Sequence, residues 1–185
     1  RGEFGLRCAG ATYEEIAAAG GGIKSTMRAT RQATLDELVV AARARLDRMF
    51  ALGVTCVEVK SGYGLDLDTE LKMLWVIRTL QESHPVELVP TFLGAHTVPP
   101  EFAGRADDYI DHVIAEMLPA VAEEGLATFC DVFCEKGVFD VNQSRRILAA
   151  AADLGLTPKV HAEQLHRIGG TRLGVEIGAA SVDHL

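Results

Sequence analysis

Three histidines lie where short apolar segments of the sequence end, and their side chains could do chemistry together. His96 follows the segment Phe92–Ala95, and His161 and His184 each close a run rich in apolar and β-branched residues. Neutral imidazole binds zinc and iron, and it also exchanges a proton near neutral pH. Three such side chains at one edge of a sheet predict metal-assisted hydrolysis or proton transfer.

Other polar side chains occupy the same place relative to the apolar segments. They follow the end of one segment or another: Lys60, Ser61, Tyr63, Glu135, Lys136, Glu163, Gln164 and Asp183. Five successive segments therefore end in groups that can bind or react. A (β/α) barrel collects the carboxyl ends of its strands around one rim, whereas an open sheet uses a single switch point. The pattern favours the barrel.

Short apolar segments alternate with longer amphipathic ones, which predicts the elements that position these residues. Strands are expected at 54–59, 86–93, 128–133, 157–161 and 180–183. Apolar residues recur at three- and four-residue spacing in the segments between them, as in helices. Helices are expected at 68–82, 106–124, 141–154 and 170–177. Repeated strand–helix–strand units imply an α/β fold with parallel strands and right-handed crossovers.

The composition excludes several classes of protein. The chain has 185 residues, 18 basic and 26 acidic side chains, a formal net charge of −8 and 48% apolar residues. The acidic balance argues against a nucleic-acid partner, and no apolar run approaches the ~20 residues of a membrane span. Cys130 and Cys134 lie in an apolar run that predicts buried free thiols. Free thiols and the lack of a signal-peptide layout predict a cytoplasmic protein.

Several short blocks of the sequence are distinctive. They are Gly10–Ile16, Gly20–Ile23, Glu58–Leu65, Phe92–His96, His161–Gln164 and Asp183–His184. In these blocks the chain resembles the imidazolonepropionase family of the amidohydrolase superfamily. The resemblance covers essentially all 185 residues. It implies a partial (β/α)8 barrel with about strands two to six present. Residues 1–185 would form a single partial barrel domain that lacks the first strand and the last strands.

The resemblance also implies a reaction and a cofactor. The family hydrolyses a small molecule, 4-imidazolone-5-propanoate, to N-formimidoyl-L-glutamate in the degradation of L-histidine. It uses one divalent metal ion, zinc or iron, which lowers the pKa of a bound water. A homodimer is further implied for the full-length protein.

Roles carry over where residues of this chain match the motifs of the family. His161 matches a metal-binding histidine. His184 matches a catalytic histidine beside the reactive water and the substrate carbonyl. Tyr63, His96 and Gln164 match residues that contact the substrate. The carboxamide of Gln164 can both donate and accept hydrogen bonds to a ring that carries N–H and C=O groups.

Other parts of the family pattern are absent from this chain, which leaves alternatives open. The family has a His-x-His metal pair, a substrate-binding arginine and a further metal-binding aspartate, so the chain supplies one of four expected metal ligands. We therefore expect the isolated chain to be inactive. Tyr13 is a weaker substrate-side candidate. Another cyclic amidohydrolase or a deaminase could share this scaffold. A non-catalytic segment that self-associates through open strand edges is the alternative of another class.

Overall fold

The sheet of this protein is built from parallel strands in sequence order. A computed structural model describes residues 5–6, 8–10 and 23–185, so Tyr13 and the Gly20–Gly22 segment lie outside the described residues. The sheet has the order β1-β2-β3-β4-β5, and each pair of neighbours is parallel. The strands are β1 (Cys56–Lys60), β2 (Glu87–Ala95), β3 (Phe129–Cys134), β4 (Thr157–Ala162) and β5 (Val182–Asp183).

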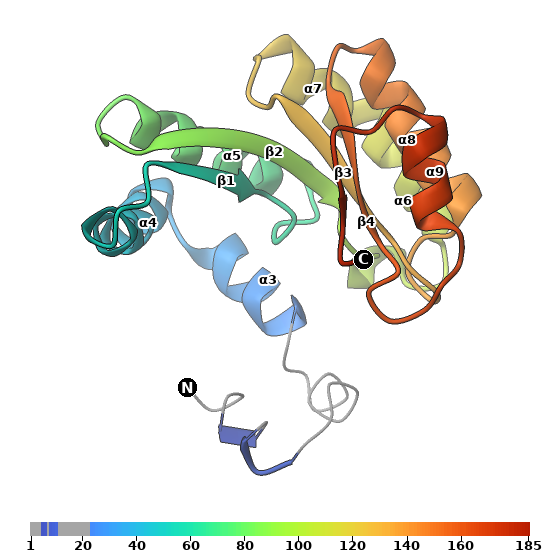
Figure 1. Ribbon diagram of the computed structural model, residues 1–185, viewed down its shortest axis with the longest axis horizontal. Coiled ribbons are helices and arrows are strands. Elements are labelled where there is room, and N and C mark those ends of the chain that lie inside the picture. The colour runs from blue at the N-terminus through green and yellow to red at the C-terminus, as the bar shows by residue number, and fades with distance from the viewer. Residues whose placement is uncertain (1–4, 7, 11–22) are drawn as a thin grey trace.

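Helices that connect successive strands cover one face of the sheet, and further helices, α3 (Ile23–Gln32) and α4 (Leu35–Ala51), precede β1 (Figure 1). The connecting helices are α5 (Leu67–Gln81), η1 (Pro100–Phe102), α6 (Ala106–His112), η2 (Val113–Met117), α7 (Leu118–Glu123), α8 (Val141–Asp153) and α9 (Gly170–Glu176). The sheet bends in the manner of half a barrel. The predicted α/β class and the partial (β/α)8 barrel are therefore confirmed. No helix within the described ranges has both the length and the apolar composition that a membrane crossing requires.

The two faces of the sheet differ in character because successive side chains of a strand point to opposite sides. Val132 and Val160 are fully buried against the helical layer. Asp131 and His161, one residue away in each strand, face the other side. The helix-covered face is thus the apolar core, and the opposite face, which is the interior of the half barrel, carries the polar groups.

The cysteines divide into a buried and an exposed pair. Cys130 and Cys134 are buried free thiols, as predicted, and Cys8 and Cys56 are exposed free thiols. Burial raises the pKa of the Cys130 thiol, and the nearby Asp131 carboxylate adds to the rise. The Cys130 thiol therefore behaves as a small core side chain rather than as a nucleophile.

The helical stretch predicted over 106–124 is present at 106–123, but it is not one regular α-helix. A π-helical segment, η2, separates α6 from α7, and the N–H of Leu118 donates to the carbonyl of Val113, five residues earlier. Pro119 follows directly and has no N–H to donate to the carbonyl four residues before it. The wider turn of η2 accommodates this missing bond at the beginning of α7.

Candidate active site

Four ionisable side chains from four strands meet inside the half barrel. The ammonium of Lys60 lies 2.6 Å from Oδ2 of Asp131 and 3.0 Å from Oδ2 of Asp183. Nδ1 of His161 lies 2.7 Å from the same Oδ2 of Asp131. The side chain of Asp131 is fully buried, and that of Lys60 is 20% exposed. We call Lys60, Asp131, His161 and Asp183 the charged cluster.

Lys60 and Asp131 each stabilise the charged form of the other. Burial disfavours charge on Lys60, but the hydrogen bond to Asp131 and the neighbouring carboxylates raise the pKa of the ammonium above its usual value. Burial likewise opposes charge on Asp131, yet the interactions with His161 and Lys60 hold the pKa of this carboxyl below its usual value. Both groups are therefore charged at neutral pH, and each depends on the other for its charge.

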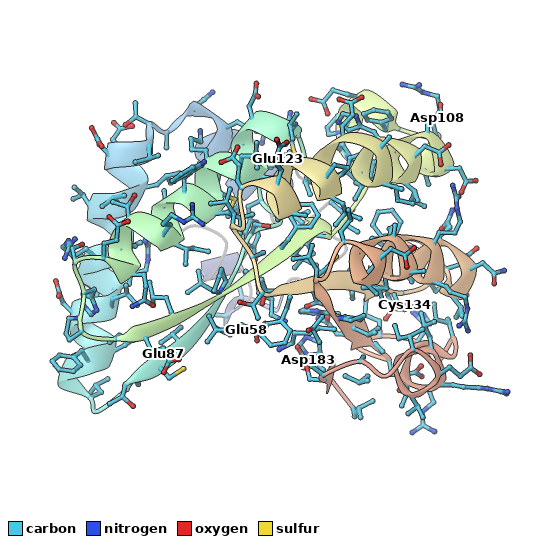
Figure 2. All side chains as sticks on the ribbon, turned by 90° about the horizontal axis from the view of Figure 1, so that it is seen from above. Glu58, Glu87, Asp108, Glu123, Cys134 and Asp183 are labelled. Atoms are coloured by element: carbon cyan, nitrogen blue, oxygen red, sulfur yellow. The ribbon has the colours of Figure 1, made fainter. Side chains whose placement is uncertain are left out.

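A further set of charges lies beside the cluster. Glu58 accepts hydrogen bonds from Lys159 at 2.8 Å and from Thr91 at 2.6 Å, and its Oε1 lies 3.4 Å from Nζ of Lys60. Burial opposes the charge of Glu58, but these partners lower the pKa of its carboxyl. Glu58 and Asp183 consequently both lie within 3.4 Å of Nζ of Lys60, and Figure 2 shows these two labelled carboxylates near one another.

The structure brings four of the five predicted site residues into one row of rings. The centroid distances are 5.2 Å from Tyr63 to His96, 6.1 Å from His96 to Phe133, 6.2 Å from Phe133 to His161 and 5.0 Å from His161 to His184. The row runs from the loop after β1 to the residue after β5. Its residues come from widely separated parts of the sequence, as expected of a barrel rim.

The hydrogen bond of His96 fixes which ring nitrogen carries the proton. Nδ1 of His96 lies 2.9 Å from the carbonyl oxygen of Gly62. A carbonyl oxygen only accepts, so Nδ1 is the donor and Nε2 of the neutral ring is an acceptor. Burial lowers the pKa of His96, although the bond to Gly62 partly offsets this effect. His96 is thus a neutral imidazole whose Nε2 can accept a hydrogen bond from a ligand.

The loop that carries Tyr63 is held by one buried carboxylate. Glu70, in the first turn of α5, is fully buried. It accepts hydrogen bonds from the backbone N–H groups of Gly62, Gly64 and Leu65, each at 2.8 Å. Gly62 has φ +93°, and an added Cβ there would lie 2.7 Å from the carbonyl oxygen of Leu93. The loop therefore has one tightly specified path, which places Tyr63 beside His96.

Gln164 lies apart from the row of rings. It is exposed on the loop after β4 and makes no hydrogen bond within the described part of the chain.

Three non-glycine residues of the described ranges have positive φ, and all three lie in loops after strands: Leu65 at 60°, Glu163 at 60° and His184 at 70°. Such strained backbone is concentrated at functional sites in proteins. Each strained residue lies within two positions of a predicted site residue or is one itself.

The donor atoms of the charged cluster fit a divalent metal ion. Asp131, His161 and Asp183 each offer one ligand atom, and these atoms all lie within 4.8 Å of one another. Nδ1 of His161 is buried and lies 2.7 Å from Oδ2 of Asp131, so the two groups are adjacent, as two ligands of one ion would be. Imidazole and carboxylate are ligands that suit zinc and iron.

Two members of the site were missed from the sequence. Asp131 and Phe133 lie inside the apolar run Phe129–Cys134, which reads as a buried strand. Period-two alternation was the available signal, because both residues share the face opposite to Cys130, Val132 and Cys134. A charged side chain in such a strand marks the face that is not covered by helices.

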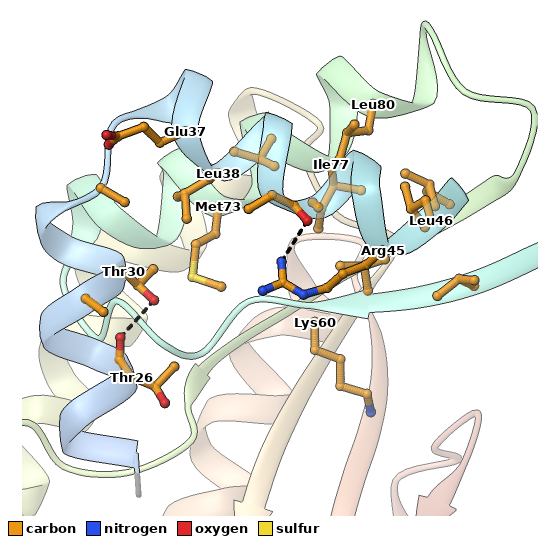
Figure 3. Close-up of a pocket in the computed structure, with 18 of the residues that line it drawn as sticks. Thr26, Thr30, Glu37, Leu38, Arg45, Leu46, Lys60, Met73, Ile77 and Leu80 are labelled. Atoms are coloured by element: carbon orange, nitrogen blue, oxygen red, sulfur yellow. Dashed lines mark hydrogen bonds between the residues drawn. The ribbon is translucent and has the colours of Figure 1, made fainter. Parts of the chain in front are cut away.

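A large apolar groove lies along the free edge of β1 (Figure 3). It has a volume of about 1000 Å³ and is lined by α3, α4, α5 and β1. Met73, Ile77 and Leu80 of α5 and Leu38 and Leu46 of α4 contribute to its walls. Of the charged cluster, Lys60 alone lines this groove. The groove and the row of rings are therefore different features of the molecule.

The fold and the site together define a class. A curved parallel sheet of β/α units, with charged groups and imidazoles gathered at the carboxyl ends of its strands, is part of a (β/α)8-barrel protein. In sequence, the chain is similar over its whole length to curated imidazolonepropionases. It is 58% identical over 183 residues to that of Paraburkholderia phymatum and 56% identical over 192 residues to that of Chloroflexus aggregans. The predicted resemblance to imidazolonepropionase is thus confirmed.

The matches cover nearly all of this chain but less than half of each relative. Each match covers 99% of this chain and 45% of the relative, so the chain spans less than half the length of these proteins. No family model matches the chain. Among solved structures, a dipeptide epimerase from Methylococcus capsulatus aligns at 14% identity and a TM-score of 0.29, covering 82% of this chain and 52% of that one. A likeness this distant carries no argument about function.

Proposed function

We propose that this chain forms part of the catalytic barrel of an imidazolonepropionase, a hydrolase of histidine degradation. The substrate would be 4-imidazolone-5-propanoate and the product N-formimidoyl-L-glutamate. The observation that carries the proposal is the row of rings from Tyr63 to His184, which lies beside the charged cluster. It combines an acceptor at His96, a metal-ligand candidate at His161 and a further imidazole at His184 in one place, as ring hydrolysis requires.

Each of the site residues would have its own role in the hydrolysis. Water adds its oxygen to the ring carbonyl carbon, the C–N bond of the cyclic amide breaks, and the ring nitrogen takes up a proton. His184, whose ring lies 5.0 Å from that of His161, would hold the proton of the reacting water. Nε2 of His96 would accept from a ring N–H, and Gln164 would both donate and accept there. Tyr63 would contact the propanoate carboxylate.

The cofactor in this proposal is one divalent ion, zinc or iron. His161 would hold it, because Asp131, His161 and Asp183 each offer one ligand atom and these atoms lie within 4.8 Å of one another. When bound, such an ion lowers the pKa of water and stabilises developing negative charge on a carbonyl oxygen. The longer protein would supply further ligands, so the isolated chain is expected to show no turnover.

A chimera tests this function directly. Residues 1–185 would replace the matching segment of the Paraburkholderia phymatum relative, an alignment of 183 residues. With zinc or iron supplied, we expect loss of the imidazolone absorbance. Changing His161 to Ala should reduce kcat/KM by about 10³-fold or more, as losses at a metal-activated water commonly do. A folded, metal-loaded chimera without turnover would contradict the proposal, and a panel of cyclic amides and amines would separate other amidohydrolases and deaminases.

Self-association of the isolated chain is a second candidate behaviour, favoured by the groove along β1. Among the described residues, strand β1 pairs with β2 alone. Val40 and Leu52 add exposed apolar surface on and after α4, at 69% and 85% exposure. Unpaired strand edges beside apolar surface promote association. Sedimentation of the 185-residue chain should show oligomers, whereas a stable monomer at micromolar concentration would oppose this behaviour.

A further inference from the structure

The loop after β4, residues 163–169, is attached to the end of β3 by one buried carboxylate. Glu135 is 1% exposed. Its Oε2 accepts hydrogen bonds from the backbone N–H of Leu165 at 2.9 Å and of His166 at 3.3 Å. Its Oε1 accepts from Nδ1 of His166 at 3.0 Å and from the N–H of Lys136 at 2.9 Å. Three of its four donors thus belong to the two residues that directly follow Gln164.

These contacts require that Glu135 be ionised. Burial opposes its charge, but the hydrogen bonds from Leu165, Lys136 and His166 hold the pKa of the carboxyl below its usual value. A carboxylate accepts at both oxygens and donates at neither, which matches the four donors around it. A buried charge of this kind fixes the groups that satisfy it, because their loss would leave it without solvation.

A second carboxylate fixes the other end of the same loop. Oε1 of Glu163 accepts hydrogen bonds from the N–H of Gly169 at 3.2 Å and of Thr171 at 3.4 Å. The backbone on both sides of Gln164 is therefore held, while its own side chain is exposed and free of hydrogen bonds among the described residues. A fixed backbone with an uncommitted polar side chain is prepared to bind a ligand at low entropic cost.

We infer that Glu135 is a positioning residue for substrate: it holds the loop that carries Gln164 in the conformation that binds the ring. This inference rests on the proposed function. Glu135 contacts none of the residues assigned to substrate or metal, so its effect passes through the backbone of Leu165 and His166. Glu70 holds the Tyr63 loop by the same means at the other end of the row of rings. The loops of Tyr63 and Gln164, two of the three that bear predicted substrate contacts, are thus both held by a buried carboxylate.

The kinetic test compares Glu135→Gln with Glu87→Gln in the chimera. The first substitution would present an NH₂ group to N–H donors, whereas Glu87 is exposed at the beginning of β2 and serves as the matched control. We expect Glu135→Gln to raise KM about tenfold with a smaller change in kcat, and the control to change neither. In a Gln164→Ala background the tenfold effect should largely disappear, since the two residues act as a unit. An undiminished effect in that background would show a general structural role and overturn the inference.

Amide hydrogen exchange provides a readout that does not need activity. In the 185-residue chain, the amides of Leu165 and His166 should exchange about tenfold faster or more in Glu135→Gln than in Glu87→Gln. Unchanged protection of both amides would overturn the inference. If Glu135→Gln fails to fold, Glu135→Asp keeps the charge with a shorter reach and should give a smaller shift of the same kind. An inactive unmutated chimera would count against the proposed function alone, because the exchange experiment decides the role of Glu135 independently.

Discussion

Lys60→Met should lower the free energy of unfolding of the chain by about 3–5 kcal/mol, the usual cost of breaking a buried ion pair on one side. The ammonium of Lys60 lies 2.6 Å from Asp131, 3.0 Å from Asp183 and 3.4 Å from Glu58. Asp131 is fully buried, so water cannot replace the lost partner. Three carboxylates would then face one another without a cation between them, and Lys159 contacts only Glu58 among them.

Urea denaturation at fixed protein concentration measures this change. Lys136→Met is the matched control, because Lys136 is an exposed lysine next to the end of β3, and it should change stability by less than about 0.5 kcal/mol. The double variant Lys60→Met, Asp131→Asn should recover much of the loss, since it removes the one fully buried carboxylate, while Glu58 keeps Lys159 and the side chain of Asp183 is 32% exposed. A loss below about 1 kcal/mol for Lys60→Met would show that the carboxylates are solvated or protonated instead.

The order of elements could be predicted because it is encoded locally. Each strand and each of the helices after β1 is marked by apolar periodicity over a continuous segment. The break at η2 could also have been anticipated, since Pro119 is visible in the sequence. The contacts between side chains of different strands could not, because they depend on how the strands pack against one another.

The histidines of the candidate site could be predicted from the sequence, but the ion pairs around them could not. His96, His161 and His184 occur at strand ends, which the alternation of elements reveals. The pairing of Lys60 with Asp131 joins residues 71 positions apart, and that with Asp183 joins residues 123 apart. No local pattern specifies such pairs. They follow from the parallel register of β1 to β5, which is a property of the folded sheet.

The burial of Glu70 could not be predicted from the residues near it in the sequence. An acidic residue in the first turn of a helix is expected to lie in solvent and to interact with the helix dipole. Asp66 does cap α5, accepting from the N–H of Thr69 at 2.8 Å. The side chain of Glu70 instead turns back into the preceding loop and is fully buried. The three N–H groups that it satisfies belong to that loop, so its burial depends on the path of the chain before the helix.

Glu70→Gln should accordingly destabilise the chain by roughly 3 kcal/mol or more, because hydrogen bonds to a charged group contribute about 1.5–3 kcal/mol each and a buried mismatch adds to their loss. Oε1 accepts from both Gly64 and Leu65, and Oε2 accepts from Gly62. A glutamine keeps one oxygen and turns an NH₂ group toward the remaining donor. The N–H of Gly62 would then lose its acceptor.

The matched control is Glu82→Gln at the other end of α5, where Glu82 is exposed, and its change should stay below about 0.5 kcal/mol. Urea denaturation gives the stability, and hydrogen exchange at Gly62 and Gly64 reports the loop itself. Ser61 contributes separately to this region, because its N–H donates to Thr91 at 3.0 Å and its hydroxyl accepts from Leu93 at 2.9 Å. If Glu70→Gln proves as stable as the control, these contacts of Ser61 are sufficient to hold the loop. If the loss is large and the two glycine amides exchange faster, the buried carboxylate of Glu70 is what places Tyr63 beside His96.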